Sequence, residues 1–225
     1  MAAARFAAVA NTALELGRGV YDARRAAALA GVPVSTLHYW AREGIYAPSV
    51  SPEPRPRLWS YADLLALRAI YWFRHRNESG ERSQVSMAKI RQALVVLQEE
   101  GLVPQMLHQL VAVSENGELF ITREENVSMR AISPRQLGWT DILHLTRPYL
   151  RGPDLVEPRP LLRIIPGKLH GEPHVVNTRI PSASLYALHR AGYAMDDIQW
   201  MYPDAPAEAV SQAIDLEGSL QRLAA

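Results

Sequence analysis

The sequence predicts a mainly α protein with small β elements, an α+β fold, and two observations indicate this class. Apolar residues recur at helical spacing in most segments that lie between turn signals. Strand-like alternation is confined to short stretches in the middle and the last third of the chain. With 225 residues, 48% of them hydrophobic, the chain can form one large domain or two small ones, each with a buried core.

Clusters of proline and polar residues predict where the chain is divided. Prolines at 48, 52, 54 and 56 indicate a loop or wing, and residues 77–83 are polar and turn-like. Prolines at 148, 153, 158 and 160 indicate a linker. We therefore expect a domain over 1–146, a linker over 147–160 and a C-terminal module over 161–225.

The first domain is predicted to contain four helices followed by a hairpin. Residues 21–46 are typical of a helix, a turn and a second helix. Ser60 and Asp63 form a capping-box pattern ahead of a helix over 60–76, and a fourth helix over 84–100 ends at Gly101. Alternation around Asn116-Gly117 predicts a β-hairpin over 109–122, which could extend a DNA surface, dimerise or brace the linker.

The second predicted helix has the two faces that a DNA-reading helix needs. Leu37, Trp40 and Ala41 share one face, which we expect to be anchored in a core. The opposite face carries a hydroxyl, an imidazole, a phenol and a guanidinium, from Ser35, His38, Tyr39 and Arg42. Such polar groups suit base edges and phosphates in a major groove.

The run from Ala30 to Gly44 closely resembles the DNA-binding domain of the MerR family, a winged helix-turn-helix. The resemblance covers residues 20–76 and implies that the Arg57-Leu58-Trp59 segment is a wing gripping the phosphate backbone. Three positions depart from the family's usual pattern. Leu58 stands where the family usually has a second Arg. Pro33 stands where the family often has a Ser that caps the helix, and His38 stands where it often has Arg. The predicted DNA-binding residues are Ser35, Thr36, His38, Tyr39, Arg42, Arg55, Arg57 and Trp59. The alternative is a winged helix retained only for packing.

The long coiled coil that follows this domain in MerR-type sensors is missing from the sequence. The chain has no cysteine, which excludes disulfides and thiolate metal sensing. The resemblance therefore implies a DNA reader and not a MerR-style metal sensor.

The C-terminal module is predicted to combine short strands with three helices. Strands are expected at 161–165 and 174–176, and helices at 182–191, 196–201 and 207–223. The module is rich in aromatic and Met side chains, which either fill its own core or form a partner surface. The residues predicted for toxin binding or dimerisation are Arg179, Tyr186, Tyr193, Trp200, Met201 and Tyr202.

The module's Thr178-Arg179-Ile180-Pro181 element and the downstream Tyr202-Pro203 resemble a bacterial family of VapB-type antitoxins. The resemblance spans residues 161–220 and implies a PIN-like ribonuclease toxin, encoded next to the chain, as partner. Arg179 would either support the turn at Pro181 or reach into the toxin's acidic nuclease site.

Charge and motif content narrow the remaining classes of function. Residues 1–100 hold 13 Arg and Lys against 9 Asp and Glu, whereas residues 101–225 hold 11 against 14. An N-terminal part with excess positive charge suits binding to nucleic acid, although an asymmetry this small also arises by chance.

We find no catalytic constellation and expect no enzyme, cofactor or metal. His170 and His174 are four positions apart, but Gly171 and Pro173 place them in a loop. No segment predicts a signal peptide or membrane span, so a cytoplasmic location is expected.

Together these patterns predict an antitoxin that is also a transcriptional autorepressor. It would bind double-stranded operator DNA as a homodimer and neutralise the ribonuclease. The alternative is a stand-alone MerR-like transcriptional regulator whose C-terminal half dimerises or senses a ligand.

Overall fold

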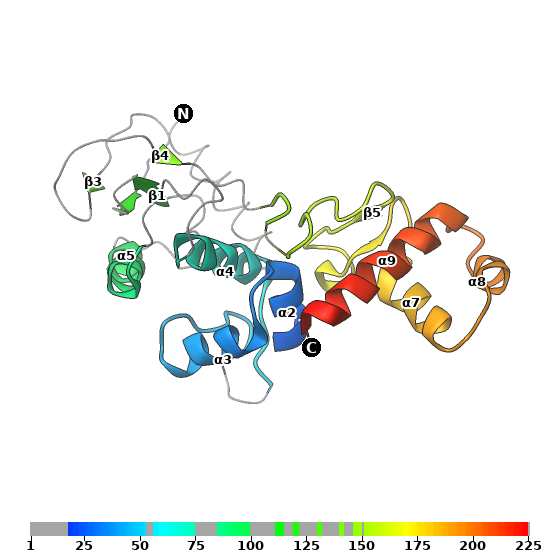
Figure 1. The fold of residues 1–225 in the computed structure, drawn as a ribbon, viewed down its shortest axis with the longest axis horizontal. Helices are drawn as coiled ribbons and strands as arrows, with labels where there is room; N and C mark the ends of the chain where they lie inside the picture. Colours follow the sequence, from blue (N-terminus) through cyan, green and yellow to red (C-terminus); the bar gives the residue numbers. More distant parts are fainter. Residues whose placement is uncertain are drawn as a thin grey trace.

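The structure is a computed structural model that describes residues 18–52, 56–74, 85–99, 111–114, 119–121, 130–131, 140–141, 146–149 and 151–224. Over these residues the fold is mainly α with two small antiparallel sheets, which confirms the predicted α+β class. In Figure 1, α3, α4 and α5 lie in the left half, and α7 and α8 lie at the right. Helix α2 and the C-terminal end of α9 meet between them.

The predicted helix-turn-helix is present as α2 (Ala23–Ala30) and α3 (Val34–Arg42). Asp22 caps α2, since its carboxylate accepts a hydrogen bond from the Arg25 backbone N–H at 2.8 Å. Gly31 ends α2 with a left-handed φ of 72°, a conformation that glycine adopts without steric cost. Pro33 makes no side-chain hydrogen bond that would cap α3.

Helices α4 (Tyr61–Arg74) and α5 (Met87–Glu99) match the predicted third and fourth helices. The capping box is formed in both directions: the Ser60 N–H donates to Asp63 Oδ2 at 2.7 Å, and the Asp63 N–H donates to Ser60 Oγ at 3.2 Å. Nearly all of α4 is buried, which makes it the central helix of the first domain.

A wing follows α3. Ser51 and Leu58 exchange backbone hydrogen bonds of 3.1 and 3.2 Å, so the chain returns antiparallel to itself. Trp59 then pairs with Tyr21 through two backbone bonds of 2.9 Å, which ties the wing to the start of α2. Arg55 lies outside the described residues.

The predicted hairpin is part of a four-stranded sheet in the order β3-β2-β1-β4. Strands β1 (Val111–Ser114) and β2 (Leu119–Ile121) pair antiparallel, which confirms the hairpin, while its turn lies outside the described residues. β3 (Arg130–Ala131) and β4 (Thr140–Asp141) are two residues long, too short to produce an alternating sequence pattern.

The C-terminal module has the predicted strands and helices. β5 (Leu162–Arg163) pairs antiparallel with β6 (His174–Val175), and a 3₁₀ turn, η2 (Leu169–Gly171), lies between them. Helices α7 (Ser182–Arg190), α8 (Met195–Met201) and α9 (Ala207–Ala224) follow. Leu185, Ile198 and Val210 are fully buried and join the three helices into one core.

The segment predicted as a linker packs against the first domain. Leu155 is fully buried, and its carbonyl oxygen accepts a hydrogen bond from the Tyr61 hydroxyl at 2.9 Å. The buried Arg68 guanidinium donates to the carbonyl oxygens of Leu29 at 2.6 Å, Arg147 at 2.8 Å and Pro153. These bonds fix the segment between the two parts of the chain.

Candidate nucleic-acid interface

Helix α3 presents a polar face on a rigid support, as the sequence predicts. Leu37 and Trp40 are buried beneath it. Ser35, His38, Tyr39 and Arg42 are exposed on the opposite side, and Thr36 is half-buried. The structure thus brings five of the predicted DNA-binding residues together on one helix, four of them exposed to solvent and Thr36 half-buried.

Arg42 is held in place by its neighbours on the helix. Its Nε donates to Glu43 Oε1 at 3.1 Å, and its guanidinium carbon lies 5.8 Å from the centre of the Tyr39 ring. Both members of the ion pair are well exposed, with side-chain exposures of 68% and 42%. An exposed pair of this kind is weak, so Arg42 can exchange Glu43 for a phosphate at small cost.

The two described wing residues have different environments. Arg57 is half-buried, and its Nε is itself buried without a hydrogen-bond partner among the described residues. Trp59 is completely buried, stacked against Tyr46 with ring centroids 6.2 Å apart. The resemblance implied that Trp59 contacts phosphate, but its ring is buried and is not available for that contact. The indole instead supports the wing from inside the core.

A hydrogen-bond cluster beneath the wing fixes its first strand to α4. Asp63 accepts bonds from the Tyr46 hydroxyl at 2.9 Å and from the Ser49 N–H and hydroxyl at 3.0 and 2.8 Å. Burial, together with the negative charge of Asp63, raises the pKa of Tyr46 well above its ordinary value. The wing and α3 are thus positioned on the same core.

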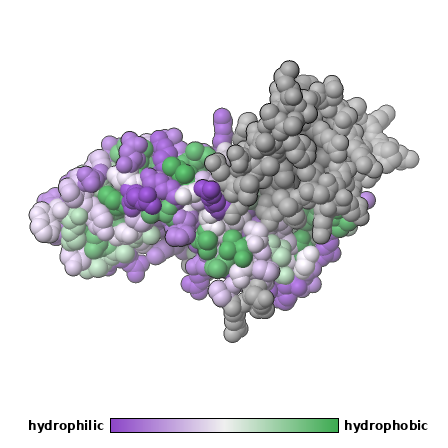
Figure 2. Space-filling view, turned by 180° about the vertical axis from the view of Figure 1, so that it is seen from behind, coloured by the Kyte–Doolittle hydropathy of each residue, from purple (hydrophilic) through white to green (hydrophobic). Residues whose placement is uncertain are grey.

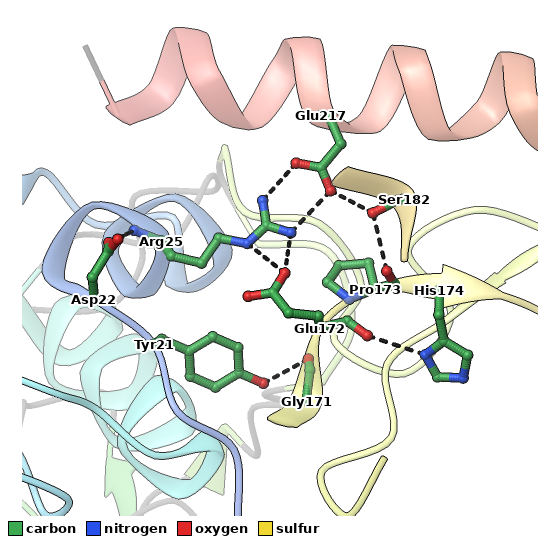
Figure 3. Close-up of polar contacts among 9 residues, drawn as sticks. All are labelled: Tyr21, Asp22, Arg25, Gly171, Glu172, Pro173, His174, Ser182 and Glu217. Atoms are coloured by element: carbon green, nitrogen blue, oxygen red, sulfur yellow. Dashed lines mark hydrogen bonds and ion pairs between the residues drawn. The ribbon is translucent and has the colours of Figure 1, made fainter. Parts of the chain in front are cut away.

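The first domain and the C-terminal module are joined by an ionic network around Arg25 of α2 (Figure 3). Its guanidinium donates to Glu217 of α9 through two bonds of 2.6 and 2.9 Å, and to Glu172 Oε2 at 3.0 and 2.5 Å. The Ser182 hydroxyl contacts Glu217 Oε1 and the Pro173 carbonyl oxygen. Arg25, Glu172, Glu217 and Ser182 are called the Arg25 network below.

The Arg25 network is largely closed to solvent. The Arg25 and Glu217 side chains are only 17% and 5% exposed. Burial alone would lower the pKa of Arg25, but its bonds and charge contacts with Glu217 and Glu172 outweigh this and raise it. Arg25 therefore stays charged, and removing either Arg25 or Glu217 would leave the other buried without its ion-pair partner.

Two more contacts lie beside this network in Figure 3. The buried Tyr21 hydroxyl donates to the Gly171 carbonyl oxygen at 2.8 Å, a second bond between the first domain and the module. His174 is buried in the module, where its Nδ1 lies 3.0 Å from the Glu172 carbonyl oxygen. Burial lowers the pKa of His174, which favours the neutral ring, and in the tautomer that satisfies this contact Nδ1 donates to the carbonyl oxygen.

The predicted partner residues of the module divide into two groups. Tyr186 and Tyr202 are half-buried, and the Tyr186 hydroxyl donates to Gln221 of α9 at 3.0 Å, so both contribute to the module's own packing. Tyr193, Trp200 and Met201 are exposed by 46%, 84% and 37%. Figure 2 shows the module, at the left, with hydrophilic and hydrophobic residues interspersed over its surface.

Arg179 is exposed and forms no hydrogen bond or ion pair with any residue that the structure describes. The turn before Pro181 is held instead by Thr178, whose hydroxyl donates to the Val175 carbonyl at 2.9 Å and accepts from the Ile180 N–H at 3.1 Å. Arg179 lies at an open groove of about 700 Å³ whose lining includes Asn177, Ile180, Asp204 and Pro206. The geometry gives Arg179 no role in supporting the turn.

Over the described part of the chain, no three His, Asp or Glu side chains come together as a metal site. In the same residues, no helix is both long and apolar enough to cross a membrane.

The contacts between the two parts of the chain were not predicted from the sequence. In the sequence, Arg25 and Arg68 only add to the positive charge of residues 1–100. One signal was present: Glu217 falls at helical spacing among apolar residues of α9, where an acid requires a cationic partner. The sequence does not say that the partner is on α2, 192 positions away.

Two protein-family models match the chain, one in the first domain and one in the C-terminal module. Residues 21–94 match the model of the MerR HTH family regulatory proteins, which spans α2 to α5. Residues 163–215 match the model described as "Protein of unknown function (DUF433)", which runs from β5 into α9. No curated protein and no solved structure matches the chain. The chain therefore combines a MerR-family helix-turn-helix domain at residues 21–94 with a DUF433 domain at residues 163–215.

Proposed function

We propose that this protein is an antitoxin and transcriptional autorepressor. The MerR-family domain marks it as a DNA-binding transcriptional regulator. In the proposal it binds its operator as a homodimer in the cytoplasm, has no catalytic activity of its own and needs no cofactor. Its DUF433 domain neutralises a PIN-like ribonuclease toxin encoded beside it.

The observation that carries the DNA-binding part is the exposed polar face of α3. Ser35, His38, Tyr39 and Arg42 project from a helix whose Leu37 and Trp40 are locked in the core. A helix anchored in this way can enter the major groove without losing its own packing. Arg57 is on the adjacent wing, and its half-buried side chain leaves part of the guanidinium for a phosphate contact.

The antitoxin part rests on the Thr178-to-Pro181 element and on the surface of the DUF433 domain. Tyr193, Trp200 and Met201 remain exposed after the module has formed its core, which favours a partner surface over simple core filling. Arg179, which forms no hydrogen bond or ion pair with the described residues, remains available to a partner's carboxylates.

DNA binding is tested by titrating the protein onto the fragment upstream of its own gene at several salt concentrations. Each phosphate contact should add about 0.9 to the slope of log affinity against log salt. Arg57→Ala should weaken specific and random DNA alike, whereas His38→Ala and Tyr39→Ala should change sequence preference. A flat salt response, or three variants that all bind like the parent, would contradict this interface.

Toxin neutralisation is tested by expressing the tagged chain with the product of the neighbouring reading frame and measuring the mass of what co-purifies. A stoichiometric complex that abolishes ribonuclease activity supports the proposal. A homodimer that leaves the neighbour's product unbound would point instead to a stand-alone regulator.

A further inference from the structure

The end of the DUF433 domain farthest from the helix-turn-helix is formed by α8 and the residues around it (Figure 1). We call residues 193–204 the α8 tip. Helix α8 is attached to the module through Ile198, which is fully buried, and through its contacts with α7 and α9. The tip is thus a defined surface of the folded module.

Apolar side chains on the α8 tip point into solvent to an unusual degree. Trp200 is 84% exposed, and Tyr193, Met195 and Met201 are 46%, 36% and 37% exposed. Trp and Tyr are enriched among the residues that dominate binding energy in protein interfaces, and Met is enriched in interfaces generally. An indole this exposed contributes little to the stability of the fold, so we expect a binding partner to bury it.

The charges of the tip indicate what kind of partner covers it. The tip contains Asp196, Asp197 and Asp204, all exposed, and it contains no Lys, Arg or His. Asp197 also caps α8 by accepting from the Ala194 N–H at 3.2 Å. The charged side chains of the tip are therefore all carboxylates, and Asp196 and Asp197 lie on the same short helix as the exposed Trp200.

This charge pattern disfavours a second copy of the chain as the occupant. Two tips placed face to face would bring the aspartates of both copies together, and neither tip contains a cation, although Arg179 lines the same groove as Asp204. A protein that binds and cleaves RNA, in contrast, needs cationic groups to hold the phosphate backbone. Such a protein offers the complementary charge.

We propose that the α8 tip is the surface on which the ribonuclease partner binds, with Trp200 in an apolar pocket of the partner and the aspartates facing its cationic groups. This inference rests on the proposed function. Because the tip and α3 lie in opposite parts of the molecule, the partner and DNA can be bound at the same time.

The test uses the full-length chain and the purified product of the neighbouring reading frame. Trp200→Ala should raise the Kd of the complex at least about thirtyfold, the effect typical of a central interface residue. Val156→Ala is the matched control, since Val156 is also apolar and 49% exposed but lies outside the tip. Thermal unfolding of both variants should match the parent, because neither side chain is in the core.

A second variant tests the charges. In Asp196→Asn/Asp197→Asn the amide oxygen at 197 can still cap α8, so the fold is retained. The association rate should fall severalfold at low salt, and the affinity should become less sensitive to salt than that of the parent. Operator binding should be unchanged in all three variants.

The outcomes separate this inference from the function on which it rests. If the parent binds the neighbour's product and Trp200→Ala binds it equally well, the α8 tip is not the site, although the antitoxin function stands. If Trp200→Ala instead converts a dimer of this chain into a monomer, the tip joins two copies and the inference is overturned. If the parent itself does not bind, both fail.

Discussion

At the scale of single residues, the backbones of the first domain and the following segment come close together at Gly31 and Gly152. A Cβ atom on Gly31 would lie 2.6 Å from the Gly152 backbone nitrogen, and one on Gly152 would lie 2.7 Å from Arg68 Nη2. Gly31 also has a left-handed φ of 72°. Both features exclude a side chain at position 31.

Gly31→Ala is therefore expected to lower the free energy of unfolding by about 2–5 kcal/mol, from left-handed strain together with overpacking against the backbone. Gly44→Ala is the matched control: its φ is +62°, but no atom lies within 4 Å of the added Cβ. It should cost only about 1 kcal/mol. Urea unfolding of the two variants measures the difference, and equal losses would show that the contact with Gly152 is unimportant.

His174 makes stability depend on pH. Burial lowers the pKa of the folded ring below 6.5, whereas the unfolded chain binds a proton with a pKa of about 6.5. Below that pH the unfolded state holds more protons than the folded state, so stability falls as pH decreases from 7 towards the folded pKa. His174→Gln should flatten this part of the stability curve, measured by urea unfolding between pH 5 and pH 7 (roughly the range in which His titrates). An unchanged slope would assign the pH dependence to other groups.

At the scale of elements, helical periodicity and caps were enough to predict most of the fold. Ser60 and Asp63 identified the start of α4 because the capping box is a local interaction, and Gly31 identified the end of α2 for the same reason. β3 and β4 were missed because two residues cannot show a period. For the candidate interface, helical spacing predicted the outward face of α3, but resemblance alone misplaced Trp59 on the surface.

The packing of α2 against α9 could not be predicted, because it depends on charges that are distant in sequence. Replacing Arg25 by Leu leaves Glu217, 5% exposed, without its cation. We expect a loss of about 2–4 kcal/mol, at or slightly below the range for a fully buried pair because Arg25 keeps 17% exposure. The double variant Arg25→Leu/Glu217→Leu should regain part of that loss, since two apolar side chains replace the two charges.

Chemical unfolding of the parent, the two single variants and the double variant gives the coupling energy. Gln221→Leu is a suitable control on the same helix, because Gln221 is exposed and its bond to Tyr186 stays within the module. Purely additive losses would mean that Arg25 and Glu217 do not stabilise each other.

At the scale of the whole molecule, the question is whether the MerR-family and DUF433 domains act separately. The Arg25 network and the Tyr21–Gly171 bond join them directly, and Arg68 binds the intervening segment through the carbonyls of Arg147 and Pro153. α2 contributes to both sides: Ala26 to Ala30 are all buried, between the rest of the helix-turn-helix and α9. The support of α3 therefore depends in part on the C-terminal module, including the end of α9 that follows the DUF433 match.

From this arrangement we expect the two domains to unfold in one cooperative transition. Calorimetry should give a single peak for the parent, because loss of the DUF433 domain would expose the buried face of α2 and the charge of Arg25. In Arg25→Leu the contact between the domains is weakened, so the transition should broaden or split in two. Operator affinity should fall in the same variant, although Arg25 lies in the interdomain network and not on the face of α3. Two separate transitions in the parent would show that the domains are energetically independent, and the DUF433 domain could then influence DNA binding only by holding two copies of the chain together.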